Sequence, residues 1–110
     1  MFNELYEYIC DLCEAKNMPP ADLRFGCLDD MPKFWSSKTN SYFEPSCVDY
    51  YAEDLENAKE IVLYILETLW DYATKPNHRI ALHIKDIVKQ DDGWLKMTIG
   101  ACLFEDDALL

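Results

Sequence analysis

Glycine, histidine and basic residues are all scarce in this sequence. The three glycines are isolated, at Gly26, Gly93 and Gly100, so the chain has neither a glycine-rich phosphate-binding loop nor the G-x-S-x-G motif of a serine hydrolase. Only two histidines are present, His78 and His83, which leaves few candidates for general acid-base catalysis. These absences predict that the protein is not an enzyme.

Long apolar runs are absent too. No stretch approaches the ~18 consecutive apolar residues that span a membrane, and the first residues, MFNELYEYICDLCEAK, carry acids where a secretion signal carries bases. The five cysteines are an odd number and do not resemble the paired framework of a small secreted protein. We therefore expect a cytoplasmic protein with reduced thiols and no membrane partner, folded as one compact domain over residues 1–110.

Acidic residues dominate the charge. The chain has 21 acidic and 10 basic residues, a formal net charge of -11, which exceeds the magnitude of about 2 to 8 that suffices for the solubility of a small domain. Most of the excess lies in residues 1–74, whereas residues 75–110 are nearly balanced. The electric field of this excess negative charge repels a nucleic-acid backbone and speeds the encounter with a cationic molecule. We therefore expect a basic protein partner and no direct binding to nucleic acid.

Two segments have the periodicity of amphipathic helices. In residues 2–16 and again in residues 52–74, apolar side chains recur every three to four positions. The prolines of NMPP and TKPN, which follow these segments, disfavour a continued helix. We expect two main helices, at about 2–16 and 52–74. On the second, Leu63, Leu66 and Trp70 form an additional apolar set.

The last third of the chain alternates instead. Apolar residues fill every second position from Leu95 to Leu103, and the segment RIALHIKDIVKQ fits a strand as well as a helix. Its β-branched residues and the DDG turn favour a β-hairpin at about 79–104. Two short strands are possible at 23–28 and 47–51, joined by a long, aromatic-rich surface connection. The predicted fold class is α+β, with both helices packed on a small antiparallel sheet that the hairpin dominates.

Cysteine and histidine raise the question of a metal site. Cys10 and Cys13 form a C-x2-C pair, and four further residues could complete a zinc site with them: Cys27, Cys47, His78 and His83. The spacing elsewhere does not fit a zinc motif, and Cys13 adjoins apolar helix positions, where free cysteine packs as a small hydrophobe. His83 and Asp86 fit a surface pair on the hairpin. We therefore expect no metal and no cofactor.

Acidic residues also share one strip of the longer predicted helix, because positions three or four apart lie on the same face. The strip consists of Glu53, Glu56, Glu60, Glu67 and Asp71, with Tyr64 in its middle. Asp11 and Glu14 extend the acidic surface on the first helix. Solvated faces are commonly charged, but they usually intermix bases that pair with the acids. Here Lys59 and Lys16 are the only nearby bases on the two helices, so we predict that these acids and Tyr64 bind a partner.

Acids and tyrosines on rigid helices can imitate the charge of a phosphate backbone to a protein that grips nucleic acid. The leading hypothesis is a non-catalytic acidic inhibitor that occludes a basic nucleic-acid-handling partner, as an immunity protein neutralises its cognate nuclease toxin. A phage-type anti-defence (anti-CRISPR-like) DNA mimic is an alternative. A structural or adaptor subunit, which packs its second apolar helix face against a copy of itself or a partner, is another.

Overall fold

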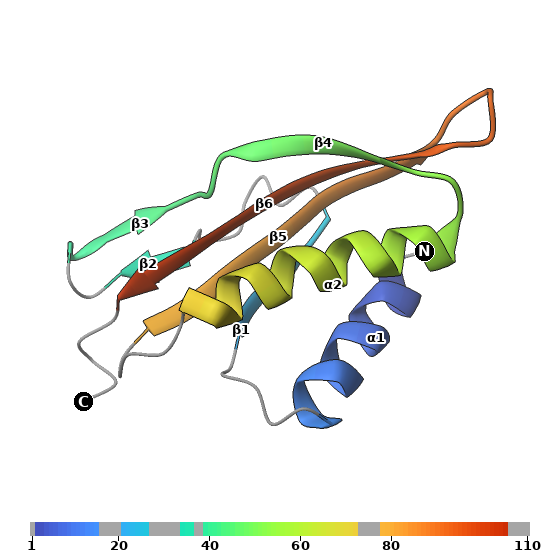
Figure 1. Ribbon diagram of the computed structural model, residues 1–110. Coiled ribbons are helices and arrows are strands. Elements are labelled where there is room, and N and C mark those ends of the chain that lie inside the picture. Colours follow the sequence, from blue (N-terminus) through green and yellow to red (C-terminus); the bar gives the residue numbers. More distant parts are fainter. Residues whose placement is uncertain (1, 16–20, 27–33, 37–38, 73–77, 106–110) are drawn as a thin grey trace.

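The computed structural model describes residues 2–15, 21–26, 34–36, 39–72 and 78–105, which form two helices and six strands (Figure 1). The elements in chain order are α1 (Phe2–Ala15), β1 (Ala21–Phe25), β2 (Phe34–Ser36), β3 (Ser41–Phe43), β4 (Cys47–Ala52), α2 (Leu55–Tyr72), β5 (His78–Lys89) and β6 (Leu95–Glu105). The predicted α+β class, the two helices and the C-terminal hairpin are confirmed. Residues 16, 27–28 and 73–74, where we expected element ends, lie outside the described residues.

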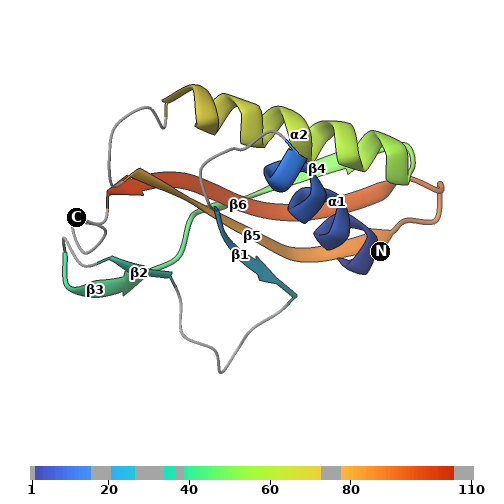
Figure 2. The ribbon, with the colours of Figure 1, turned by 90° about the horizontal axis from the view of Figure 1, so that it is seen from below.

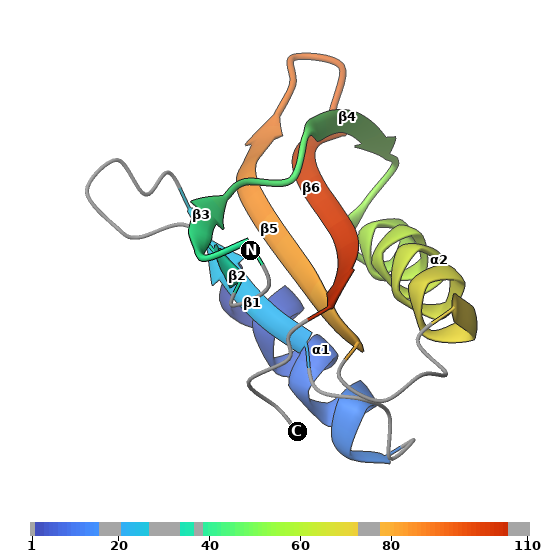
Figure 3. The ribbon, with the colours of Figure 1, turned by 90° about the vertical axis from the view of Figure 1, so that its left-hand side faces the viewer.

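The main sheet has four strands in the order β1-β5-β6-β4. The hairpin strands β5 and β6 pair antiparallel, and β4 adds antiparallel to the far side of β6. At the other edge β1 pairs parallel with β5, with Leu23 opposite Leu82, so the sheet is mixed rather than purely antiparallel. Figure 3 shows β4 and β1 at the two edges and the hairpin between them.

The hairpin resolves the ambiguity between strand and helix in its first half. A β-bulge between Ile84 and Asp86 shifts the alternation of β5, so that Ile84 and Ile87 are both buried although they lie three residues apart. That spacing is what resembled a helix in the sequence. In the turn, the Gly93 amide donates to the Gln90 carbonyl at 2.9 Å, and Gly93 has a φ of 90°, a conformation that favours glycine.

Both helices cover the same face of the main sheet, as Figures 1 and 2 show. The core lies between these layers. It contains Leu5 and Ile9 of α1, a row of α2 residues, and the inward residues of β5 and β6 such as Ile80, Leu82, Met97 and Ile99. Within the described residues, no helix combines the length and the apolar character needed to cross a membrane.

The helix α2 begins three residues later than predicted because Asp54 caps it. The Asp54 carboxylate accepts a hydrogen bond from the Asn57 amide at 2.8 Å, and the Asn57 side chain accepts one from the Glu53 amide at 2.9 Å. The first of these contacts satisfies an amide group that the first turn leaves unpaired. Residues up to Ala52 instead continue β4.

The buried face of α2 includes residues that the adaptor hypothesis requires to face a partner. Its buried residues are four apart: Ala58, Val62, Leu66 and Trp70. Leu66 is completely buried and Trp70 is only 8% exposed, whereas Leu63 is half-buried. Two members of the additional apolar set therefore belong to the core of this chain.

The segment predicted as an irregular connection contains a second, two-stranded sheet. In it β2 pairs antiparallel with β3, with Trp35 opposite Tyr42. The rings of this pair lie 4.8 Å apart in an edge-to-face contact. Phe43 contacts Phe104 of β6, with ring centroids 5.1 Å apart. The β2-β3 sheet therefore packs near the end of β6, on the face of the main sheet that the helices leave open (Figure 2).

Candidate functional site

The predicted acidic residues of α2 lie on its solvent-facing side. We define the α2 acidic strip as Glu53, Glu56, Glu60, Tyr64, Glu67 and Asp71. At about 100° per residue, the five that belong to α2 span an arc of about 80°. Glu56, Glu60 and Asp71 are exposed, Glu67 is half-buried, and Tyr64 is 73% exposed. Glu53 is exposed but precedes the helix, in the cap described above.

Lys59 lies beside this strip and contacts both the strip and the first helix. The Lys59 ammonium is 3.4 Å from a Glu56 carboxylate oxygen and 5.6 Å from the ring centroid of Tyr8 on α1. Among the described residues, Glu60 and Asp71 have no ion-pair partner. At these two positions the strip therefore presents uncompensated negative charge to solvent.

The position of Asp71 works against the stability of α2. Asp71 lies in the last turn of this helix, where the described residues include no base. The carbonyl end of a helix carries partial negative charge, so an acid there is unfavourable by about 0.3–1 kcal/mol. Glu67, four residues earlier, adds a like charge at a spacing that is mildly repulsive. Helix formation alone gives no reason for these acids.

A shallow apolar groove borders the strip, which the sequence did not reveal. This α2–β4 groove has a volume of about 220 Å³. Its apolar lining comes from the helix and from β4 and β6: Val48, Tyr50, Ile65, Leu69, Ile99 and Ala101. Tyr64 and Thr68 form its border on the side of the strip. The sheet order leaves β4 at an edge, and Val48 is exposed there, so the groove is open to a partner.

The other predicted binding residues do not join this surface equally. Asp11 and Glu14 are exposed on α1, but they lie in the half of α1 that diverges from α2 (Figure 1). The exposed aromatic rings of Trp35 and Tyr42 belong to the β2-β3 sheet, on the opposite face of the main sheet (Figure 2). One flat partner surface therefore cannot contact the strip and these aromatic residues together.

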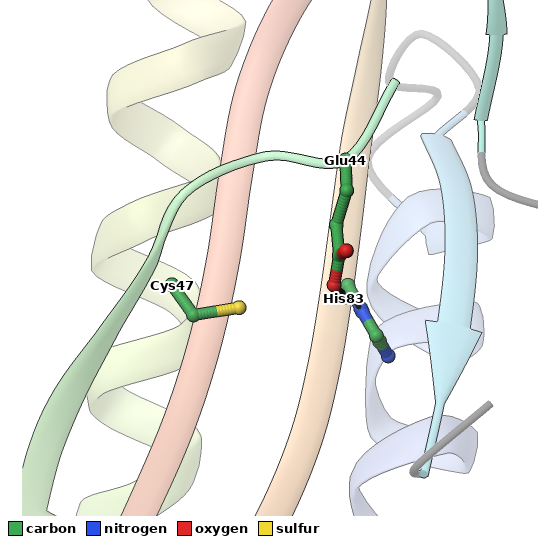
Figure 4. A group of neighbouring side chains, drawn as sticks. All are labelled: Glu44, Cys47 and His83. Atoms are coloured by element: carbon green, nitrogen blue, oxygen red, sulfur yellow. Dashed lines mark ion pairs between the residues drawn. The ribbon is translucent and has the colours of Figure 1, made fainter. Parts of the chain in front are cut away.

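A second group of side chains meets on that opposite face. We call Glu44, Cys47 and His83 the far-face cluster (Figure 4). The register places Cys47 of β4 opposite Gly100 of β6, and Gly100 opposite His83 of β5. Glu44 comes from the segment that leads from β3 into β4. One carboxylate, one thiol and one imidazole nitrogen lie within 4.8 Å of one another.

His83 is held in one orientation by its second ring nitrogen. Its Nε2 is 2.9 Å from the Gly26 carbonyl oxygen, and because a carbonyl can only accept, Nε2 carries the hydrogen. Nδ1 then faces the Glu44 carboxylate at 3.7 Å. His83 is only 6% exposed, so the prediction that it forms a surface pair with Asp86 is wrong. Its position in β5 points it to the far face, under the segment that carries Glu44.

The far-face cluster does not have the properties of a cysteine nucleophile. Burial raises the pKa of the Cys47 thiol, and the nearby Lys85 ammonium only partly opposes this. Glu44 and Asp49 raise this pKa further. A reactive cysteine needs a lowered pKa, because the thiolate is the attacking species. The thiol is therefore protonated at neutral pH and gives no reason to infer covalent catalysis.

Two of the six candidate zinc ligands in the sequence thus meet in space, Cys47 and His83. Cys27 and the side chain of Cys13 lie outside the described residues. Glu44 was missed, because the sequence does not show which residue of a connection passes over a sheet. Ala81, an apolar residue between the core residues Ile80 and Leu82, was the available signal that both faces of this strand are covered.

Comparison with protein-family models, with curated proteins and with solved structures gives no match for this chain. Its function is therefore argued from the geometry of these two sites.

Proposed function

We propose that this protein is a non-catalytic inhibitor that binds and occludes a basic, nucleic-acid-handling protein, most simply an immunity protein that neutralises a cognate nuclease toxin. The observation that carries this proposal is the placement of acids on α2. Exposed carboxylates continue to the last turn of the helix, where Asp71 opposes the helix dipole and no base of the described residues accompanies it. Acids that lower stability in this way are explained by binding to a cationic surface.

The groove beside the strip supplies the second part of a specific interface. Interfaces usually combine an apolar centre, often with tyrosine, and a charged rim. Tyr64 belongs to both the strip and the border of the α2–β4 groove. In the proposed complex, the groove takes an apolar or aromatic side chain of the partner. The strip contacts lysine and arginine side chains that otherwise hold substrate phosphate.

Charge and groove have different roles in this mechanism. The net charge of -11 speeds the encounter with a cationic partner and makes the association rate fall as salt rises. The groove determines which basic protein stays bound, because desolvated apolar contacts at the centre of an interface dominate its affinity. Carboxylates that cover the cationic substrate site then exclude nucleic acid by simple occlusion.

A DNA mimic with an anti-defence role is the second candidate, favoured by the same strip. The two candidates differ in the role of the α2–β4 groove, because a pure phosphate mimic binds its partner through charge alone. Replacing Tyr64 with alanine keeps every charge. In the immunity protein this variant loses affinity for its nuclease, whereas in a phosphate mimic it binds almost as tightly as the unchanged protein.

The structural or adaptor hypothesis loses much of its basis. It required Leu63, Leu66 and Trp70 to face a partner, but Leu66 and Trp70 are already covered by this chain. A homodimer would instead have to form through the groove or the β4 edge. Sedimentation or light scattering of the purified protein over a range of concentrations tests it directly.

The test of the proposal is affinity capture with charge-reversed variants. The unchanged full-length protein is the bait, compared with a strip variant, Glu56→Lys with Glu60→Lys. The control is Asp86→Lys with Asp91→Lys, which changes the net charge equally at exposed hairpin positions outside α2. Captured proteins are identified by mass spectrometry, and each purified candidate is assayed for nuclease activity with increasing amounts of the bait.

The expected result is one basic nuclease, inhibited at a 1:1 ratio by the unchanged protein and by the control. The strip variant should bind it more weakly by more than about 1 kcal/mol while circular dichroism shows an intact fold. If both variants bind the nuclease equally well, the strip is only solvated surface. If many basic proteins elute together at modest salt, the charge is unspecific and the inhibitor proposal is wrong.

A further inference from the structure

The far-face cluster brings the three kinds of donor atom that zinc prefers within 4.8 Å of one another. Zinc in proteins prefers sulfur, nitrogen and carboxylate oxygen in tetrahedral geometry, with bonds of about 2.0–2.3 Å that place ligand atoms about 3.4–3.6 Å apart. His83 Nδ1 and a Glu44 oxygen are 3.7 Å apart, and all three donor atoms lie within 4.8 Å. We propose that Cys47, His83 and Glu44 bind a Zn²⁺ ion, through the sulfur, Nδ1 and one carboxylate oxygen.

Gly100 makes this meeting possible. Cys47 and His83 lie on β4 and β5, with β6 between them, so their backbones are two strand spacings apart, about 9.5 Å. The residue between them in register is Gly100. A β-carbon there would lie 3.1 Å from the Cys47 sulfur and 2.8 Å from the Pro45 carbonyl oxygen. The missing side chain leaves room for the sulfur to reach across β6 and for Pro45 to cross directly above it, which brings Glu44 over the cluster.

The orientation of His83 is that of a metal ligand. A histidine that binds zinc usually donates its other ring N–H to a carbonyl or carboxylate, which fixes the ring and its tautomer. The Gly26 carbonyl has this role for Nε2, which leaves Nδ1, the nitrogen that would bind the metal in the neutral ring, facing Glu44. Gly26 is itself fixed by a 2.9 Å hydrogen bond from its amide to the Ile84 carbonyl. Backbone groups of two neighbouring segments therefore hold the ring of His83 in place.

Lys85 competes with the metal for Glu44. Its ammonium is 3.6 Å from the same Glu44 oxygen that faces His83. Both side chains are partly exposed, with 42% of Lys85 and 32% of Glu44 open to solvent, so Lys85 can move away as the ion enters. Three protein ligands leave a fourth position, which takes water at the solvent side.

Bound zinc would fasten the segment around Pro45 to β5. That segment links β3 to β4, so the ion ties the β2-β3 sheet to the main sheet at one point. A thiolate ligand selects zinc over magnesium and calcium, which prefer oxygen. Because the thiol must lose its proton to bind, affinity falls as pH is lowered.

The experiment titrates the full-length, chelator-treated, reduced protein with Co²⁺ and then displaces the cobalt with Zn²⁺. Cobalt bound by a cysteine thiolate gives a sulfur-to-metal charge-transfer band, and tetrahedral coordination gives intense visible bands. Cys47→Ser is compared with Cys102→Ser, which alters a half-buried cysteine of β6 outside the cluster. Glu44→Gln is a third variant at a solvent-facing position, and Mg²⁺ serves as the metal control.

We expect one tightly bound Co²⁺ per chain with both sets of bands. Zn²⁺ should abolish these bands, and Mg²⁺ should not. Cys47→Ser should lose the charge-transfer band and bind zinc at least ~100-fold more weakly, since even outer-shell changes cost 10- to 100-fold. Cys102→Ser should match the unchanged protein. Glu44→Gln should keep the charge-transfer band with weaker binding.

Two results overturn the proposal. The first is the absence of any thiolate band at saturating Co²⁺, and the second is a band that survives in Cys47→Ser, which assigns the metal to another cysteine. Lys85→Gln adds a readout that a purely structural ion-pair network would not give. Removing the competing cation should tighten zinc binding several-fold, and unchanged or weaker binding in a folded Lys85→Gln protein counts against the site.

Discussion

Substitutions at the two ends of α2 test whether some of its acids lie where they lower the stability of the protein. Glu56 lies in the first turn of α2 and Asp71 in the last. Glu56→Gln and Asp71→Asn each remove one negative charge with little change in shape or helix propensity. Because both reduce the net charge equally, any general relief of repulsion cancels when the two are compared.

The helix dipole gives these two changes opposite signs. An acid near the N-terminus stabilises a helix by about 0.3–1 kcal/mol and an acid near the C-terminus destabilises it by a similar amount. We expect Glu56→Gln to lower the free energy of unfolding, the more so because it breaks the 3.4 Å pair with Lys59. Asp71→Asn should raise it, so the two variants should differ by about 0.6–2 kcal/mol.

Urea denaturation followed by circular dichroism at low salt measures this difference, and a repeat at high salt should reduce it through screening. The reasoning about Asp71 is refuted if both variants change stability in the same direction by the same amount. In that case only net charge matters, and the main support for a binding role of the strip disappears. If Asp71→Asn is more stable and also binds the partner more weakly, the acid is retained at a cost in stability for the sake of binding.

Three further predictions concern the core, the crossing segment and a cysteine. Leu66→Ala should lower the free energy of unfolding by about 2–5 kcal/mol at any protein concentration. Leu63 is half-buried, so Leu63→Ala should lower it clearly less. Equal decreases in urea denaturation would contradict the assignment of Leu66 to the core. Gly100→Ala should destabilise the protein, since the new β-carbon would meet the Pro45 carbonyl oxygen at 2.8 Å, and a melting temperature equal to that of the unchanged protein would show that the crossing is not tight. Burial raises the pKa of the Cys102 thiol. Peptide mapping should therefore find that this thiol is alkylated slowly at neutral pH and faster as the pH rises. Alkylation as fast as that of cysteine in an unfolded peptide would show the thiol to be exposed.

Periodicity in the sequence was sufficient for the helices and the hairpin because each depends on local pattern. The alternation from Leu95 to Leu103 and the β-branched residues of β5 predicted two paired strands correctly. Helix ends were less certain: the start of α2 depends on the Asp54 cap, which apolar spacing cannot reveal. The parallel direction of β1 could not be predicted, because it depends on the route of the whole chain between β1 and β5.

The β2-β3 sheet and the far-face cluster could not be predicted from the sequence, for a related reason. Strands of three residues, rich in serine and flanked by turn residues, carry too little pattern to distinguish them from a loop. Cys47 and His83 lie 36 positions apart and meet only through the registers of β4 with β6 and of β6 with β5. Their meeting also requires the absence of a side chain at Gly100, a residue that in the sequence is indistinguishable from any isolated glycine.

The main sheet separates the two candidate sites and so makes them independent. The α2 acidic strip lies on the outer side of a helix that covers one face of the main sheet (Figure 2). The far-face cluster lies on the other face, under the segment around Pro45. The two are also opposite in character, because most of the strip's acids are exposed to solvent, whereas His83 is buried and hydrogen-bonded to backbone. Groups that face away from each other across a packed layer do not bind the same small region of a partner. The acids of α2 are thus suited to recognition by a second protein, and the cluster to an ion that fastens two parts of this chain.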